Sequence, residues 1–247
     1  MTSLNRPHAA AVIIGNEILS GKYQDENSPA LIQEFRRIGV RLCKIETILD
    51  DIDTICATVK RLASSHDCVV TSGGIGPTHD DLTIDAVAKA LGTEVIVEPS
   101  MVTALEAHYG TDLTSGQRRL ARVPRGSILH WVDRGKWPAI QCANVFIFPG
   151  VPSLFRRNLG VFRSIYPDLP PFWLRSVTLL AQESDVVATL DSIVAAHPQV
   201  DVGSYPRFEN GRPELRLTME CGEPDVVEAA LKDLLANLPT DLVLRIE

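Results

Sequence analysis

The sequence has no long hydrophobic run. Its longest uninterrupted apolar segment, residues 9–14, is far shorter than the roughly 20 residues that a membrane-spanning helix needs, and it is also too short for the core of a secretory signal. The five cysteines are scattered, odd in number and without a Cys-x-x-Cys pair, which argues against a disulfide framework or a zinc site. We therefore expect a cytoplasmic protein with no membrane partner.

Basic charge is also scarce. The net charge is −7, whereas a nucleic-acid-binding surface needs clustered Lys and Arg, so we expect no nucleic-acid partner. A Gly-x-Ser-x-Gly elbow is missing, which leaves serine hydrolase chemistry without support. The three tryptophans, Trp131, Trp137 and Trp173, are expected in the core or at an interface rather than as a stacking platform.

Strand-like and helix-like segments alternate over the first two-thirds of the chain. Strands are predicted at residues 9–14, 40–48, 68–72, 94–97, 128–132 and 144–148. Helices are predicted at residues 28–38, 51–64, 84–91, 101–109, 115–122 and 151–162. This alternation predicts an α/β domain with a mostly parallel sheet and helices on both of its faces.

A proline-rich break at Pro167, Pro170 and Pro171 predicts a linker between two domains, residues 1–166 and 172–247. The second domain has its own order of elements. Strands are expected at 173–180, 200–205, 214–220 and 242–246, and helices at 184–196 and 224–238. This β-α-β-β-α-β order is the split βαβ pattern of a small ferredoxin-like α+β domain.

The most informative stretch is residues 73–83, which read Gly-Gly-Ile-Gly-Pro-Thr-His-Asp-Asp-Leu-Thr between a predicted strand and a predicted helix. A glycine-rich turn in this place binds phosphate through backbone N–H groups, because glycine has no Cβ to block the ligand. We expect Gly73, Gly74 and Gly76 to form the cradle. The hydroxyls of Thr78 and Thr83 are expected to orient phosphate oxygens.

Two adjacent carboxylates in this loop need an explanation. A pair of unit charges about 4 Å apart interacts by about 4 kcal/mol at a partly buried site, so Asp80 and Asp81 alone would repel a phosphate. A divalent cation such as Mg²⁺, Mn²⁺ or Co²⁺ would offset that repulsion, and ligand hydroxyl or ring N–H donors would also suit a carboxylate. Helix capping is the alternative for one aspartate, but it does not easily account for both. For His79 an acid or base role is the alternative to a structural role, which is the more common one for a single histidine in a loop.

Three loops follow the carboxyl ends of predicted strands, at residues 15–27, 73–81 and 149–153. Ligands of open α/β sheets bind at this edge, so the three loops are expected to converge on one cleft. Taken alone, the first loop reads as a polar surface loop and the third as a simple turn.

The motifs at residues 15–21, 73–83 and 149–152 together resemble the molybdopterin-binding (MoaB/Mog-like) domain superfamily, above all the N-terminal part of competence/damage-inducible protein A and of eukaryotic FAD synthase. The segments 203–206 and 215–218 resemble the small second domain of both families. The resemblance implies a three-layer α/β fold and a homo-oligomer. It also places Glu17, Asn27 and Gly150 beside a ligand held by residues 73–83.

The resemblance further implies a function. The competence-protein branch resembles a metal-dependent pyrophosphatase of ADP-ribose and related dinucleotides. The FAD synthase branch is similar to an FAD-hydrolysing unit. In both cases Asp80 and Asp81 are the expected metal ligands and catalytic residues. The alternative is a non-catalytic module that holds molybdopterin or a nucleotide.

Two departures from these families matter. Asn16 stands where relatives often carry Asp, which removes one possible metal ligand. The sequence ends at Glu247 without an amidohydrolase or adenylyl-transferring domain, so deamidation of nicotinamide mononucleotide and synthesis of FAD are not expected.

Overall fold

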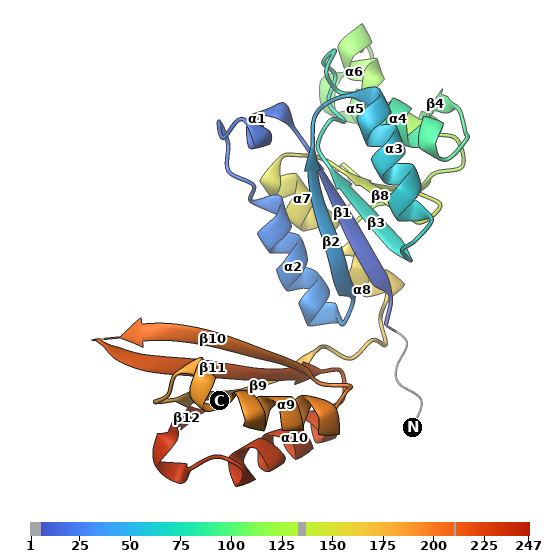
Figure 1. Ribbon diagram of the computed structural model, residues 1–247. Coiled ribbons are helices and arrows are strands. Elements are labelled where there is room, and N and C mark those ends of the chain that lie inside the picture. Colours follow the sequence, from blue (N-terminus) through green and yellow to red (C-terminus); the bar gives the residue numbers. More distant parts are fainter. Residues whose placement is uncertain (1–5, 133–136, 210) are drawn as a thin grey trace. The chain divides into compact units, whose positions relative to one another are not determined.

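The computed structural model describes residues 6–132, 137–209 and 211–247. The chain divides into two compact units, the first ending at Leu169 and the second spanning Pro170–Glu247 (Figure 1). The division falls within the proline-rich segment, and each unit has its own sheet and its own core.

The first unit is built on a six-stranded sheet with the order β2-β1-β3-β8-β7-β6. Its strands are β1 (His8–Ile14), β2 (Arg41–Ile48), β3 (Cys68–Ser72), β6 (Ile128–His130), β7 (Ala139–Cys142) and β8 (Val145–Phe148). The pairs β2–β1, β1–β3 and β3–β8 are parallel, whereas β8–β7 and β7–β6 are antiparallel. The parallel strands therefore end at one common edge of the sheet.

The sheet separates two hydrophobic cores. Side chains of β1 alternate between them, with Val12 and Ile14 in one core and Ala9 and Ala11 in the other. The first core is covered by α3 (Ile52–Ala63), α4 (Thr83–Ala90) and α5 (Pro99–Tyr109), and the second by α2 (Asn27–Ile38), α7 (Pro152–Asn158) and α8 (Val161–Ile165) (Figure 1). The predicted α/β fold with a mostly parallel sheet between two helical layers is confirmed.

A smaller piece of structure extends the first core beyond the main sheet. It consists of the antiparallel pair β4 (Val95–Val97) and β5 (Arg122–Pro124), together with α5 and α6 (Ser115–Arg119). The α5 helix starts at a proline after Glu98, whose carboxylate accepts from the Ser100 amide. The α6 helix starts with a capping box between Thr114 and Gln117.

The second unit has the predicted β-α-β-β-α-β order. Its main elements are β9 (Trp173–Leu179), α9 (Val187–Ala196), β10 (Asp201–Glu209), β11 (Arg212–Cys221), α10 (Pro224–Ala236) and β12 (Val243–Ile246), with short 3₁₀ turns at Glu183–Asp185 and Thr240–Leu242. All strand pairs are antiparallel in the order β10-β11-β9-β12, and both helices cover one face of the sheet (Figure 1). The split βαβ pattern is thus confirmed.

Several elements differ from the sequence prediction. The strands β5 and β7 and the short helix α1 (Asn16–Leu19) were not predicted, and the predicted helix at 151–162 is two helices, α7 and α8. The β7–β8 hairpin turns through Ala143 and Asn144, with Ala143 at a φ of 52°. Such a turn usually carries Gly or Asn at its first position, so the sequence lacked the usual hairpin signal. Residues 133–136, next to the predicted strand at 128–132, lie outside the described residues.

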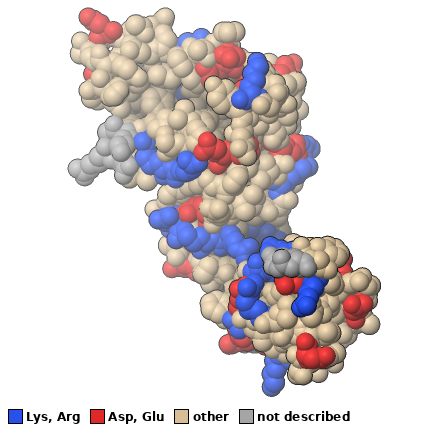
Figure 2. Space-filling model, turned by 90° about the vertical axis from the view of Figure 1, so that its left-hand side faces the viewer, with Lys and Arg blue, Asp and Glu red and all other residues tan. Residues whose placement is uncertain are grey.

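The surface carries both signs of charge. On the face shown in Figure 2, Asp and Glu side chains lie among the Lys and Arg side chains. Of the helices within the described ranges, none is long and apolar enough to cross a membrane.

Phe162 is the packing centre of the second core, because its ring lies 4.8 Å from Phe35, 4.8 Å from Phe146 and 5.8 Å from Phe148, centroid to centroid. We expect Phe162→Ala to lower the free energy of unfolding by about 3–5 kcal/mol. The matched control is Phe208→Ala, whose ring is 78% exposed and whose loss should change stability by less than about 0.5 kcal/mol. Urea unfolding measures both, and equal losses would contradict this description of the core.

Candidate functional site

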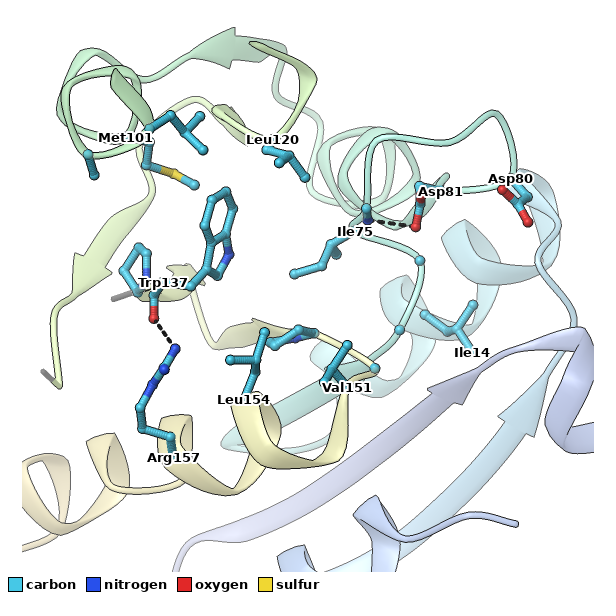
Figure 3. A pocket seen from close by; sticks show the side chains of 18 of the residues that line it. Ile14, Ile75, Asp80, Asp81, Met101, Leu120, Trp137, Val151, Leu154 and Arg157 are labelled. Atoms are coloured by element: carbon cyan, nitrogen blue, oxygen red, sulfur yellow. Dashed lines mark hydrogen bonds between the residues drawn. The ribbon is translucent and has the colours of Figure 1, made fainter. Parts of the chain in front are cut away.

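A cavity of about 690 Å³ lies at the carboxyl edge of the parallel strands (Figure 3). It is lined by the loops that follow β1, β2, β3 and β8, and by α5, α7 and residues near Trp131 and Trp137. Its volume is within the range of small-molecule sites, about 300–1,000 Å³. The cleft predicted from the loop positions is therefore present. Its lining also includes residues outside these loops, on α5 and α7 and near Trp131 and Trp137.

The glycine loop is shaped by contacts that leave no space for a side chain. Gly73 has a φ of 103° and Gly74 a φ of 66°, and an added Cβ would overlap the Ile14 carbonyl oxygen at the first position and the Thr83 hydroxyl at the second. Thr83 fixes the turn through two hydrogen bonds. Its hydroxyl donates to the Gly73 carbonyl at 2.8 Å, and its backbone N–H donates to the Gly74 carbonyl at 2.9 Å.

The amides of Gly74 and Ile75 have no partner in the part of the chain that the structure describes, and both residues line the cavity. Unpaired backbone donors at a cavity wall, just before a helix, suit an anionic ligand. The Gly73 amide is not available in this way, because it donates to the Phe148 carbonyl at 3.2 Å.

Asp81 closes the loop on itself. Its carboxylate accepts from the Gly76 amide at 2.6 Å, from the Thr78 amide at 2.8 Å and from the Thr78 hydroxyl at 2.5 Å (Figure 3). The α4 helix begins at Thr83 after Leu82, without a side-chain cap, so Asp81 is not its cap. An added Cβ at Gly76 would overlap the Asp81 carboxylate, which explains the third glycine of the motif.

Four carboxylates gather at the loop end of the cavity: Glu17, Asp50, Asp80 and Asp81. Asp80 is 61% exposed, and the neighbouring Thr78 side chain and the residue's own amide hold its pKa below the ordinary value. His79 is 97% exposed and its Nδ1 lies 3.9 Å from Asp80. Within the described ranges, no three His, Cys, Asp or Glu side chains are arranged to hold a metal ion by themselves.

Asp50 was missed by the sequence analysis, although it stands two residues after a strand that ends at the same edge as β1 and β3. Its carboxylate accepts from the Asn16 amide at 2.7 Å, and the Asn16 side-chain oxygen accepts from the Asp50 amide at 3.4 Å. Asn16 thus joins the loops after β1 and β2. Burial raises the pKa of Asp50, and the carboxylates of Glu17, Asp80 and Asp81 raise it further against the lowering by the Asn16 amide.

Not every predicted site residue faces the cavity. Those that line it are Glu17, Gly73, Gly74, Gly76, Asp80, Asp81 and Gly150. Thr83 is fully buried, and Thr78 uses its hydroxyl on Asp81. Asn27 is buried and bridges two loops, with its side-chain amide 2.8 Å from the Ser72 hydroxyl and 2.8 Å from the Gly150 carbonyl. Thr78, Thr83 and Asn27 therefore shape the loops that line the cavity.

The other end of the cavity is apolar and aromatic. Its wall includes Met101, Leu105, Tyr109, Leu120, Trp131, Trp137, Val151 and Leu154. The sequence analysis did not find this end, because α5 and the segment around Trp137 reach the cavity only through folding. Trp137 packs against the first core, as predicted, and both Trp131 and Trp137 also line the cavity.

Comparison with known proteins identifies the family. Residues 10–169 match the family described as "Probable molybdopterin binding domain", and residues 171–247 match the family described as "FAD synthase, middle domain". The chain belongs to the molybdopterin-binding domain family, and its second unit is similar to the FAD synthase middle domain. The resemblance noted from the sequence motifs is thereby confirmed.

Individual relatives agree with this assignment. A protein of Archaeoglobus fulgidus is 30% identical, over 79% of this chain and 84% of its own length. A "Probable FAD synthase" of Caenorhabditis briggsae is 31% identical over 94% of this chain, which spans only 50% of that relative. The crystal structure of a CinA protein of unknown function from Thermoplasma acidophilum has a TM-score of 0.61 at 28% identity, covering 66% of this chain and 99% of the other.

The contacts of Asp81 lead to a stability prediction. We expect Asp81→Asn to lower the free energy of unfolding by about 1–3 kcal/mol, because the new amide group presents donors to the loop's N–H groups. Asp80→Asn makes the same change of charge at an exposed carboxylate, and its effect on stability should be much smaller. Urea unfolding and hydrogen exchange of the Gly76 and Thr78 amides measure the difference. Equal effects of the two variants would refute the closing role of Asp81.

The raised pKa of Asp50 leads to a second prediction. Because the pKa of Asp50 is raised in the folded protein, ionisation of this carboxyl destabilises the fold. The stability that the protonated carboxyl contributes is full below the unfolded-state pKa and is lost as the pH rises through the folded-state pKa. We expect Glu17→Gln to lower the pKa of Asp50, with part of the elevation remaining because burial is its largest cause. Carboxyl-carbon NMR titration measures the shift. Glu26→Gln is the control, since Glu26 is bonded to Arg156 instead.

Proposed function

We propose that the first unit binds a phosphorylated small molecule and hydrolyses a nucleotide pyrophosphate of the ADP-ribose or FAD type with the help of a divalent metal ion. The single observation that carries this proposal is the combination at one end of the cavity. Unpaired amides of Gly74 and Ile75 there stand beside the carboxylates of Asp80 and Asp81.

The phosphate would occupy the glycine loop. Two amides without partners can donate to its oxygens, and the loop cannot collapse onto them because Thr83 and Asp81 hold its shape. Hydrogen bonds to a charged acceptor are worth about 1.5–3 kcal/mol each, so the cradle provides affinity as well as orientation. Nearby carboxylates act against this affinity unless a cation accompanies the ligand.

These carboxylates suit a hard divalent cation, but only when phosphate oxygens of the ligand complete its coordination. Mg²⁺ is commonly held by one or two carboxylates together with substrate phosphate oxygens, and this fits a site without three preformed protein ligands. Asp80 and Asp81 would hold the ion, Asp80 with its exposed carboxylate and Asp81 from within the loop, and Asp50 stands close enough to influence it. A bound ion supplies charge neutralisation and an activated water.

Hydrolysis adds water across the P–O–P bond and converts ADP-ribose into AMP and ribose 5-phosphate. The chain's own part is to position the bond at the loop amides, to neutralise charge on the phosphate oxygens, and to surround the rest of the ligand with apolar walls. The names of the relatives support the choice of ligand, since one is a "Probable FAD synthase" and one family is described by molybdopterin binding.

A second candidate function is binding without turnover, with molybdopterin or a nucleotide held as cargo. It is favoured by the same absence of a complete metal-ligand set in the described residues, and by the use of both Asp81 oxygens within the loop. A fold shared by binders and catalysts does not decide between them.

We expect the purified protein with Mg²⁺, Mn²⁺ or Co²⁺ to release AMP from ADP-ribose or FAD, and Asp80→Asn to reduce kcat by about 100-fold or more while ligand binding persists. Chromatographic assay of AMP measures turnover, and calorimetry measures binding. The control is Asp53→Asn, a carboxylate of α3 that is paired with Lys89 outside the cavity. Release of no AMP with any of the metals, combined with tight pterin binding, would reject hydrolysis and select the binding module.

A further inference from the structure

One cavity residue has no role in the proposed phosphate chemistry. Arg157 of α7 is the only Lys or Arg among the described residues that line the cavity. Figure 3 shows it beside Trp137, at the opposite end of the cavity from Asp80 and Asp81. Val151, which precedes α7, and Leu154, one turn before Arg157, line the cavity as well.

The Arg157 guanidinium is held by few partners. Its Nη2 donates to the Trp137 carbonyl at 3.1 Å, and no carboxylate of the described residues pairs with it. Its Nε is enclosed and donates to nothing within those residues. A guanidinium carries five N–H donors, and within the described residues only the Nη2 bond to the Trp137 carbonyl uses one of them. The Nη groups therefore keep donors for the acceptor atoms of a ligand in the cavity that Arg157 lines.

The surroundings of Arg157 indicate what kind of group this is. The Trp137 indole projects into the cavity, with Met101 and Leu120 on one side of it and Leu154 on the other (Figure 3). Such walls suit a flat, weakly polar ring and disfavour a second phosphate, because a doubly charged group would be desolvated there with one cation as its partner. Arg157, a pure donor, would then meet acceptor atoms on the edge of the ring.

We propose that Arg157 and Trp137 form a ring-recognition subsite for a planar heterocycle with hydrogen-bond acceptors on its edge, such as a nucleobase, a flavin or a pterin. The inference rests on the proposed function, because the phosphate of the same ligand occupies the glycine loop at the other end. Specificity for the ring is then separate from affinity for the phosphate.

The competing role of Arg157 is purely structural. Its bond to the Trp137 carbonyl, with the Asn158 side chain 3.4 Å from the Pro138 carbonyl, fastens this segment to α7. Arg157→Gln keeps a side-chain donor for the carbonyl but removes the charge and most of the donors. Arg156→Gln is the matched control, since the neighbouring Arg156 bonds to Glu26 on the surface and does not line the cavity.

The experiment compares AMP and FMN, which carry a planar heteroaromatic ring, with ribose 5-phosphate, which carries none, by calorimetry in the presence of Mg²⁺. We expect Arg157→Gln to weaken AMP or FMN binding by about tenfold or more and to leave ribose 5-phosphate binding unchanged, whereas Arg156→Gln changes neither. The ring probe that loses more affinity identifies the heterocycle.

Equal weakening of all three probes by Arg157→Gln would assign Arg157 to the phosphate and overturn the inference, as would unchanged binding of AMP and FMN. Failure of wild type to bind any probe would instead refute the proposed function, and the ring subsite with it.

A second measurement needs no change at the site. Trp173→Phe removes the one tryptophan of the second unit and leaves Trp131 and Trp137, which both line the cavity. In this variant we expect AMP to change the tryptophan emission and ribose 5-phosphate to leave it unchanged. If AMP saturates the protein without any change in emission, the proposed subsite is wrong. This test remains valid even if Arg157→Gln fails to fold.

Discussion

The bond between the Thr83 hydroxyl and the Gly73 carbonyl is the contact on which the site depends. It ties the first turn of α4 to the end of β3, and with the Thr83 N–H bond to Gly74 it turns the loop carbonyls toward the helix. The amides of Gly74 and Ile75 are thereby left without partners at the cavity wall. Because Thr83 is fully buried, this contact is protected from water and should persist whether or not a ligand is present.

Charge in the cavity is distributed along its length. Carboxylates from three separate loops meet at the glycine end, and the Arg157 guanidinium is the only one that the described residues place at the aromatic end. Burial, and after it the neighbouring carboxylates, raise the pKa of Asp50, and proteins commonly retain such like-charge clusters where function requires them. The two ends of the cavity therefore differ in sign as well as in polarity.

Among the described residues, those that line the cavity belong to the first unit, between Ile14 and Arg157. The second unit has a separate core around β9, β11 and α10. The family assignments divide the chain at nearly the same place, with matches to residues 10–169 and 171–247. The chemistry proposed for the chain accordingly rests on residues of the molybdopterin-binding domain.

The sequence alone determined the fold class, the alternation of strands and helices in the first unit, the split βαβ unit and the glycine loop. These features follow from apolar periodicity, from the positions of Gly and Pro and from a local motif, all of which act over short distances along the chain. It did not reveal β7, whose hairpin has Ala143 rather than glycine or asparagine at the first position of its turn, nor that Asn27 and Thr83 support the loops from inside. Only the tertiary structure decided that Asp50, Trp137 and Arg157 share one cavity with Asp81. These residues come from four separate segments, and no local pattern encodes which of them the parallel sheet brings together.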